Sequence, residues 1–181
     1  MKILTFAGSL RKDSLNKKVC RNVEKFVLSQ DLGEIKFIDL QPLNIPIYDG
    51  DNEISSGLPS EVQKLCAEII NSDALILSSP EYNGSISGVM KNLLDWISRH
   101  KPNPFSGKHV LLCAASPGAL GGVRGLWHTR VPFEVLNCHV YPEMLGFPKA
   151  HEAFESDLRI KDDKTREHFE KVLRDFIDYV Q

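Results

Sequence analysis

The sequence has little net charge and no long apolar run, and both absences limit what the protein can be. Its 22 Lys and Arg residues nearly balance its 24 Asp and Glu residues, which gives a formal net charge of −2. Because nucleic-acid-binding domains are usually strongly basic, we expect no nucleic-acid partner. The longest uncharged stretch near the middle, residues 110–123, is interrupted by proline and glycine. It is shorter than the roughly 18 apolar residues of a membrane helix, so we expect no membrane span.

Cysteine is scarce and unclustered. The four cysteines lie far apart, at Cys20, Cys66, Cys113 and Cys138, and form no Cys-x-x-Cys motif. None of the six histidines stands at the spacing typical of metal ligands. The apolar stretch that begins at Ile3 reaches charged residues within eight positions, too early for a signal peptide of about 15 to 30 residues. These patterns predict no structural metal, reduced thiols and a cytoplasmic location.

The length is sufficient for a substantial core. At a prior of about 150 residues per domain, the 181 residues predict a single domain over 1–181. A chain of this size buries roughly 70% of the surface that its unfolded state exposes, so it needs no disulfide or metal to fold. The sequence contains no linker, internal repeat or low-complexity tract.

Short apolar runs alternate with amphipathic stretches along the chain. Apolar runs of about four to eight residues bounded by turn residues predict buried strands, and longer segments with helical periodicity predict helices. The predicted strands are residues 3–7, 35–40, 74–78, 109–115 and 138–141. The predicted helices are residues 15–29, 60–72, 88–98, 121–137 and 164–179. Three prolines after the second strand predict an extended connection, and residues 49–57 are predicted to form an exposed loop.

This alternation predicts an α/β fold with a doubly wound parallel sheet and helices on both faces. The chain length favours the five-stranded flavodoxin-like form, with strand order 2-1-3-4-5, over a six-stranded dinucleotide-binding fold. In such a sheet, ligands bind beyond the carboxyl ends of the strands that flank the switch between the first and third strands. We therefore expect a site in the loops after the first, third and fourth predicted strands.

The loop after the first strand is rich in polar groups. Ser9, Arg11, Ser14 and Asn16 lie where this strand turns into a helix. The free N–H groups of a helix start attract an anion, and arginine adds a charge-assisted hydrogen bond, so the loop is suited to one terminal phosphate. The glycine patterns of a Walker loop and of a dinucleotide fingerprint are both absent. An alternative interpretation is that Asp13 or Ser14 only caps the helix and that Arg11 is a solvated charge.

Two further loops have residues suited to a flat ring. After the third strand, Tyr82 and Asn83 offer an aromatic face and an amide. After the fourth strand, residues 116–125 contain four of the 12 glycines, which would let the backbone approach a planar ligand closely. Each loop could also be an ordinary turn or a flexible connection. Their shared position at one edge of the predicted sheet favours a binding site.

Three segments in these loops, GSLRKDSLN, PEYNGSISGVMKNLLDW and SPGALGGVR, resemble the NADPH-dependent FMN reductase family, which includes quinone and chromate reductases of flavodoxin-like fold. The resemblance extends from residue 1 to about residue 146, and it implies FMN as the cofactor with NADPH or NADH as co-substrate. Carried over position by position, it implies three groups of cofactor-binding residues. The phosphate loop would be Ser9, Arg11, Ser14, Leu15 and Asn16; the loop at the isoalloxazine ring would be Pro80, Glu81, Tyr82, Asn83 and Gly84; and the loop on the other flank would be Ser116, Gly118, Gly121 and Gly122.

The resemblance also implies an activity and an assembly. NAD(P)H would pass a hydride to the bound flavin, and a quinone, free flavin, azo compound or metal oxyanion would then take two electrons, with no catalytic side chain. The family forms homodimers or homotetramers. Ser87 stands where many relatives have proline, a departure that concerns the start of the following helix. The role of Arg124 stays open, because it could stabilise a reduced ring, bind the co-substrate's phosphates or pair with a carboxylate.

The chain lacks residues that several other classes of protein require. A hydrolase with Ser116 as its nucleophile is excluded because Pro117 has no N–H for the oxyanion hole. A low-molecular-weight phosphatase needs arginine six residues after Cys113, where Ala119 stands, and a phosphoacceptor receiver needs acidic residues at the ends of the first and third strands. The remaining alternative is a non-enzymatic flavodoxin-type electron carrier that acts with protein partners. Such carriers tend to be strongly acidic, and the net charge of −2 argues against one.

Overall fold

The computed structural model describes all 181 residues. The strands are β1 (Lys2–Ala7), β2 (Glu34–Ile38), β3 (Ala74–Ser78), β4 (Glu81–Tyr82), β5 (Ser85–Ile86), β6 (His109–Ala115), β7 (His139–Val140) and β8 (Leu145–Phe147). The helices are α1 (Leu15–Ser29), α2 (Gly50–Ser56), α3 (Ser60–Ile70), α4 (Gly88–Ile97), α5 (Val123–Val135) and α6 (Asp163–Val180), with a 3-10 turn η1 (Gln41–Leu43). No helix combines the length and the apolar character that crossing a membrane requires.

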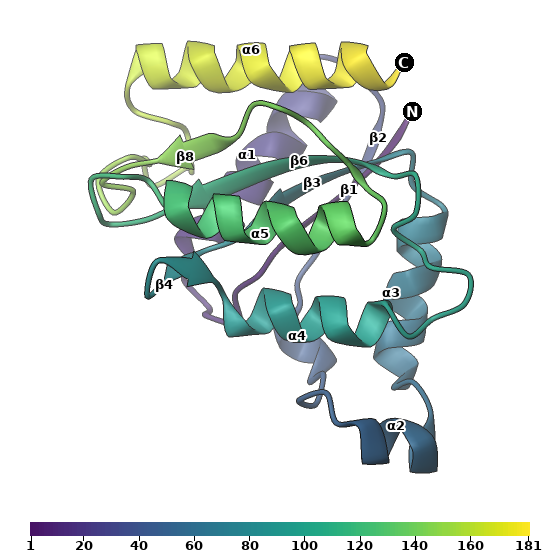
Figure 1. Cartoon of the computed structure of the whole chain (residues 1–181). Coiled ribbons are helices and arrows are strands. Elements are labelled where there is room, and N and C mark those ends of the chain that lie inside the picture. The colour runs from purple at the N-terminus through teal and green to yellow at the C-terminus, as the bar shows by residue number, and fades with distance from the viewer.

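A central sheet lies between two layers of helices. Helices α1 and α6 cover one face, while α3, α4 and α5 cover the other (Figure 1). The sheet order is β2-β1-β3-β6-β7, every pairing in it is parallel, and β8 also pairs with β6. The predicted fold class and strand order are therefore confirmed. In this order the connection changes direction between β1 and β3, which is where a ligand-binding crevice is expected.

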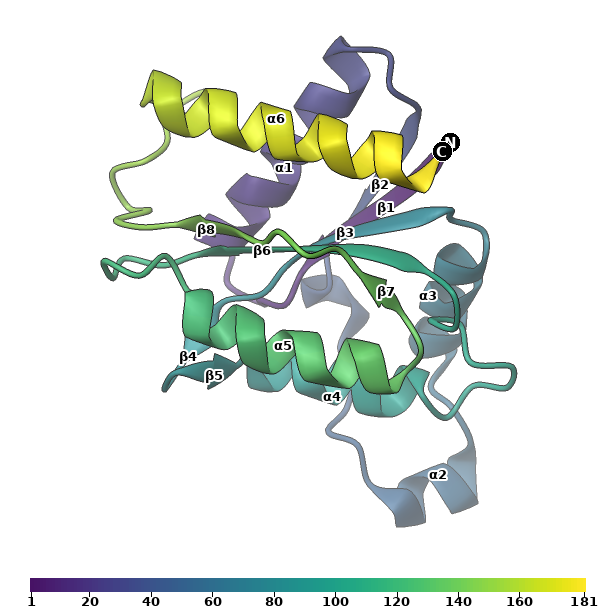
Figure 2. The ribbon, with the colours of Figure 1, turned by 45° about the horizontal axis from the view of Figure 1, so that its top comes forward.

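The edge of the sheet next to β6 differs from the prediction. A single strand over residues 138–141 was expected, but two short strands, β7 and β8, lie along β6 instead. Figure 2 shows both beside β6 on the same edge of the sheet. Pro142 stands between the two strands and has no N–H to donate to a sheet ladder, so a continuous strand through this position is disfavoured.

The connection after β2 is more ordered than predicted. The expected extended segment contains the 3-10 turn η1, and the expected loop over residues 49–57 contains the exposed helix α2. The Asp49 side chain accepts a hydrogen bond of 2.8 Å from the N–H of Asp51, and Gly57 ends the helix with a φ of 71°. A seven-residue helix with few apolar residues has little hydrophobic periodicity, which is why only its capping residues could have indicated it.

Two apolar cores hold the layers together. Every residue of β3 is buried, as expected for a central strand that is covered on both faces. One core lies between the sheet and α3, α4 and α5, with Phe6 and Trp96 among its largest side chains. The other lies between the sheet and α1 and α6, with Phe176 fully buried. This packing fixes the carboxyl ends of β1, β3 and β6 relative to one another.

Candidate functional site

Asn16 joins the three loops at the carboxyl edge of the sheet. Its side-chain Oδ1 accepts hydrogen bonds from the Ser78 hydroxyl at 2.8 Å and from the Ala115 N–H at 2.9 Å, and its Nδ2 donates to the Ala115 carbonyl at 2.9 Å. Ser78 ends β3 and Ala115 ends β6, so this buried amide fixes the first turn of α1 to both strands. Its side chain is thus used within the protein, and only its backbone N–H remains for a ligand.

The loop between β1 and α1 presents unpaired donors. Ser9 and Ser14 are buried, and the Ser14 hydroxyl caps α1 by accepting from the Lys17 N–H at 3.4 Å. The Ser9 hydroxyl accepts from the Arg11 N–H, also at 3.4 Å. The backbone N–H groups of residues 12–14 donate to no acceptor within the chain. Together with the start of α1, where Leu15 is the first helical residue, they form an arrangement of free donors that is suited to an anion.

Four cations surround this loop, and two of them are free. Lys17 pairs with Asp39 at 2.7 Å and Lys18 pairs with Asp13 at 3.0 Å. Burial alone would raise the pKa of Asp39, but the hydrogen bonds from Lys17 and from the Gln41 N–H, together with the Lys17 charge, outweigh it and the pKa is lowered. Arg11 and Lys12 are exposed and form no ion pair. Their charges are therefore available to a ligand anion.

The loop after β3 forms a short hairpin that the sequence analysis did not identify. Strands β4 and β5 pair antiparallel, and the turn between them has left-handed Asn83 (φ 52°) and Gly84 (φ 73°). These angles make a type I′ turn, for which Asn-Gly is the strongest sequence signal, so the motif itself could have predicted the hairpin. Pro80 is buried at its base, whereas the Tyr82 side chain is 50% exposed beside the site.

The glycine-rich loop after β6 is shaped by its own packing. A Cβ on Gly122 would lie 2.7 Å from the Ala114 Cβ, and one on Gly121 would lie 2.9 Å from the backbone of Gly146. Both glycines have positive φ, at 88° and 62°. The expected reason for these glycines was close approach to a ligand, but contact with the protein's own strands already requires them. The residues that face outward are Gly118, whose N–H donates to the Ser116 hydroxyl at 3.1 Å, and residues 119–120, whose N–H groups have no acceptor.

Glu81 and Arg124 form an ion pair across the site. The guanidinium donates from Nε at 2.9 Å and from Nη2 at 2.5 Å to Oε1 of Glu81, and the Gly125 N–H donates to Oε2 at 3.1 Å. Of the three roles left open for Arg124, the structure shows pairing with a carboxylate. The Glu81 side chain, expected at the cofactor, is directed to α5 instead.

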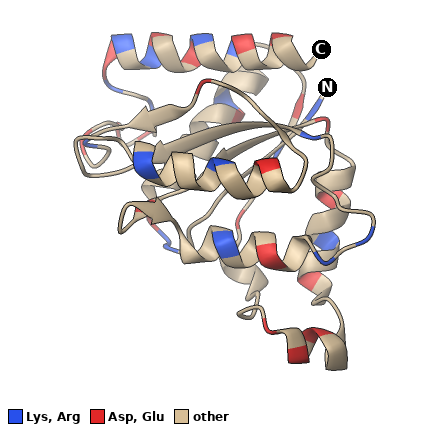
Figure 3. Ribbon diagram, viewed as in Figure 1, with Lys and Arg blue, Asp and Glu red and all other residues tan.

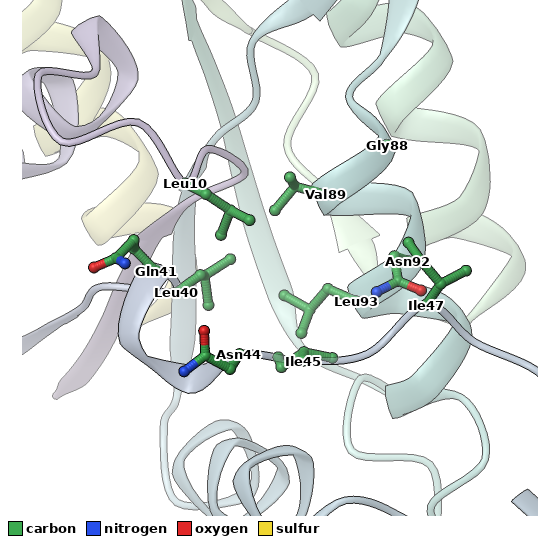
Figure 4. A pocket seen from close by; sticks show the side chains of 10 residues that line it. All are labelled: Leu10, Leu40, Gln41, Asn44, Ile45, Ile47, Gly88, Val89, Asn92 and Leu93. Atoms are coloured by element: carbon green, nitrogen blue, oxygen red, sulfur yellow. The ribbon is translucent and has the colours of Figure 1, made fainter. Parts of the chain in front are cut away.

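A separate pocket of about 320 Å³ lies behind the first loop (Figure 4). Leu10 and Val89 point toward each other across it, and Ile45 and Leu93 close its floor. Its lining comes from the β1–α1 loop, the segment around η1 and the helix α4. The sequence analysis did not predict it, because its apolar residues are spread over three segments with no common period. It contains none of the predicted ring-binding residues.

The chain is similar to proteins named reductases or oxidoreductases over nearly its whole length. The family model described as NADPH-dependent FMN reductase matches residues 1–152. The "Quinone reductase" of Escherichia coli is 32% identical, with 100% of this chain and 96% of the relative covered. The "NAD(P)H-dependent FMN reductase" of Pseudomonas aeruginosa is 35% identical, with 96% and 92% covered. The structure of FerB, a flavoenzyme NAD(P)H:(acceptor) oxidoreductase from Paracoccus denitrificans, matches with a TM-score of 0.83 at 27% identity, covering 99% of this chain and 96% of that one.

Proposed function

Since the chain belongs to the NADPH-dependent FMN reductase family, we propose that it binds FMN at the carboxyl edge of its sheet and uses NAD(P)H to reduce a small-molecule acceptor. The acceptor that we favour is a quinone, because the Escherichia coli relative is named quinone reductase. Free flavins, azo compounds and metal oxyanions are further candidates. The observation that carries the proposal is the arrangement of three loops with free N–H donors around one edge of the sheet.

The β1–α1 loop fits the phosphate of FMN. Residues 12–14 offer N–H groups without acceptors, and Arg11 and Lys12 offer unpaired positive charge. An anion at this helix start would satisfy those donors and gain from the helix dipole. Ser9 and Ser14 add hydroxyls at the base of the loop. We assign Ser9, Arg11, Ser14, Leu15 and Asn16 to the phosphate, the last two through their backbone N–H groups.

The hairpin and the glycine-rich loop fit the two flanks of a flat ring. Tyr82 presents an exposed aromatic side chain, and Asn83 presents an amide at the turn. The N–H groups of residues 119–120 lack acceptors and would address ring oxygens and nitrogens from the other flank. When bound, FMN supplies a ring that accepts a hydride and passes two electrons onward. The protein's part is to orient the ring, and the residues that we assign to it are Pro80, Tyr82, Asn83, Gly84, Ser116, Gly118, Gly121 and Gly122, with Glu81 as a support.

The non-enzymatic carrier is not favoured. Positively and negatively charged residues are interspersed along the ribbon in Figure 3, and the net charge is only −2. An electron carrier that docks on protein partners benefits from a surface of one sign. The relatives are also named reductases rather than carriers.

The visible absorption spectrum of FMN-supplemented protein tests the proposal most directly. The flavin band should persist after removal of free FMN and should bleach rapidly when NADPH or NADH is added without oxygen. Parallel titrations with the two nucleotides identify the preferred donor. Bound flavin that neither nucleotide reduces would support the carrier, and a colourless protein would contradict both functions.

We further propose that the protein is a homodimer or homotetramer. Trp127, Val131 and Val135 are exposed apolar residues at intervals of four along α5, so they form one stripe on the helix. The stripe borders a groove of about 570 Å³ between α4 and α5, which Val131, Pro132 and Leu94 help to line. An exposed apolar stripe beside an apolar groove is typical of a surface that a second protein chain covers.

We also propose a cytoplasmic location. All four cysteines are free thiols, and all four are buried. Burial raises the pKa of Cys138 to about 12, so this thiol stays protonated and unreactive. A fold without disulfides and a reaction that consumes NAD(P)H both fit a reducing compartment.

A further inference from the structure

The Glu81 carboxylate is buried, charged and fully occupied by groups of α5. Its side chain is 8% exposed, whereas that of Arg124 is 58% exposed. Its two oxygens accept three hydrogen bonds, two from Arg124 and one from the Gly125 N–H. Burial would raise the pKa of Glu81, but the Gly125 N–H and Arg124 outweigh it and the pKa is lowered. A charged group that is hydrogen-bonded in this way is expensive to displace.

The contact around this carboxylate leaves no free space. A Cβ on Gly125 would lie 2.8 Å from the Glu81 Cβ, 2.9 Å from its Cα and 3.1 Å from the Ser85 carbonyl. One turn further along α5, the ring of His128 forms a hydrogen bond of 2.9 Å with the Ser85 hydroxyl through Nδ1. The first two turns of α5 are thus in direct contact with both strands of the β4–β5 hairpin.

The hairpin needs this support. Each of its strands has only two residues, and isolated two-stranded hairpins are marginally stable in water. Its turn carries Asn83 next to the exposed Tyr82, and α5 begins directly after the glycine-rich loop. The contact between Glu81 and α5 therefore connects the two loops that flank the proposed ring site.

We propose that Glu81 is a positioning residue, which acts through Arg124 and Gly125 to set the separation and the rigidity of those two loops. It does not contact the ligand through its carboxylate. The identity of that ligand as FMN rests on the proposed function, but the link between hairpin and helix does not. Residues 43 and 44 positions apart in the sequence make this link.

Two substitutions disturb the contact from opposite sides. Glu81→Ala removes the acceptor and leaves the Gly125 N–H unpaired, while Gly125→Ala inserts a methyl group where backbone already lies. The matched controls are Glu61→Ala, which removes a surface ion pair with Lys64 on α3, and Gly88→Ala, where nothing lies within 4 Å of the new Cβ. Glu81→Gln keeps an oxygen that can accept from the Gly125 N–H, so its effects should be smaller than those of Glu81→Ala. Arg124→Met tests the guanidinium alone if Glu81→Ala fails to fold.

The first measurement is hydrogen–deuterium exchange of the protein without flavin, read by mass spectrometry. Peptides that cover residues 81–86 and 123–126 should exchange at least several-fold faster in Glu81→Ala and Gly125→Ala than in either control, while peptides from β1 and β3 stay unchanged. The second measurement is FMN affinity by fluorescence titration, which should fall tenfold or more, together with altered visible circular dichroism of the flavin that remains bound.

The outcomes separate this inference from the proposed function. Exchange rates and FMN affinity that match the controls in both variants would overturn the positioning role. Wild-type protein that binds no FMN would contradict the proposed function, and the exchange data would still decide whether Glu81 holds the hairpin to α5. Equal loss in Glu81→Gln and Glu81→Ala would show that charge, rather than the hydrogen bond to Gly125, maintains the contact.

Discussion

Arg11 and Asn16 lie five residues apart, Arg11 in the β1–α1 loop and Asn16 in the first turn of α1, and the structure gives their side chains different tasks. Arg11 is exposed and unpaired, as a ligand-binding cation should be. Asn16 is buried and makes three hydrogen bonds to the ends of β3 and β6. Both residues are polar and both lie at a helix start, so the sequence alone assigned them to the same phosphate. Only their surroundings separate a candidate contact from a structural link.

Replacing Arg11 by Ala should weaken FMN retention. A hydrogen bond to a charged group contributes about 1.5 to 3 kcal/mol, which corresponds to a roughly ten- to hundredfold rise in the dissociation constant. Fluorescence titration with FMN measures this dissociation constant. Lys25→Ala, on the far end of α1 from the loop, is the control cation and should leave the affinity unchanged. Undiminished affinity in Arg11→Ala would remove Arg11 from the phosphate loop.

His109 should make stability depend on pH. Its ring stacks on His139 with centroids 5.0 Å apart and meets Tyr179 edge-on at 5.3 Å, and its buried Nδ1 has no hydrogen-bond partner. Burial and, to a lesser extent, the His139 charge lower the pKa of His109 below the usual value of 6.5. The unfolded chain therefore binds the proton more tightly, and stability decreases as the pH falls below about 6.5.

Urea unfolding at about pH 7.5 and pH 5.5 measures this loss. His109→Phe keeps an aromatic ring in the stack but cannot be protonated, so its unfolding free energy should fall less between the two conditions. The same decrease in both proteins would contradict the assignment. FMN affinity should not change in this variant, because His109 begins β6 at the edge opposite the site.

At the scale of elements, the spacing of apolar residues predicted the helices that pack on the sheet. The bounds of α1 match the sequence prediction at both ends, and Ser14 caps its start. The helix α5 begins at Val123 rather than at residue 121, because Gly121 and Gly122 are left-handed. The exposed helix α2 was missed because it has no apolar face. Local signals therefore predicted the elements that pack on the sheet better than the ones that project from it.

Ser87, which precedes the first residue of α4, connects two elements next to the proposed site. Its hydroxyl caps α4 by accepting from the Met90 N–H at 3.1 Å and donates to the Gly8 carbonyl at 2.8 Å, with the side chain fully buried. Ser87→Ala should lower the free energy of unfolding by about 1 to 3 kcal/mol, because it removes a cap and leaves the carbonyl unpaired.

Urea unfolding of Ser87→Ala beside Asp162→Ala checks this value. Asp162 caps α6 in an exposed position, where water replaces the lost hydrogen bonds. Asp162→Ala should therefore lower the free energy of unfolding by less than Ser87→Ala does. A larger decrease in the free energy of unfolding for Asp162→Ala would show that burial of the Ser87 hydroxyl does not determine how much it contributes to stability.

At the scale of the whole molecule, the layered sheet leaves one prominent apolar surface uncovered. The stripe of Trp127, Val131 and Val135 beside the groove between α4 and α5 faces away from both cores. Figure 2 shows these two helices next to each other on the outer side of the sheet. Their position near the β4–β5 hairpin would bring a second chain close to the proposed ring site.

Val131→Lys should therefore convert the oligomer into smaller species in sedimentation velocity, because a charge would be buried in an apolar contact. Ile54→Lys is the matched control, since Ile54 is exposed on α2 and does not line the groove. Wild-type protein that sediments as a monomer at every concentration would contradict the proposed assembly. A dimer that tolerates Val131→Lys would place its interface elsewhere.

The sequence alone determined the class of fold, the strand order and the three loops in which to look for a site. These follow from local patterns, because the period of apolar residues and the turn residues between them act over a few neighbouring positions. The sequence also showed which chemical groups these loops contain, namely a cation, an aromatic ring and a glycine cluster.

Only the tertiary structure decided which side chains meet. Asn16 bonds to Ala115 across 99 positions, and Glu81 bonds to Arg124 across 43. The clash that requires Gly122 to lack a side chain comes from Ala114, and Pro142 divides the last strand only because both halves lie on β6. Such contacts form only when the packing of the layers brings together segments that lie far apart in the sequence. A local period of apolar residues does not specify which segments these are.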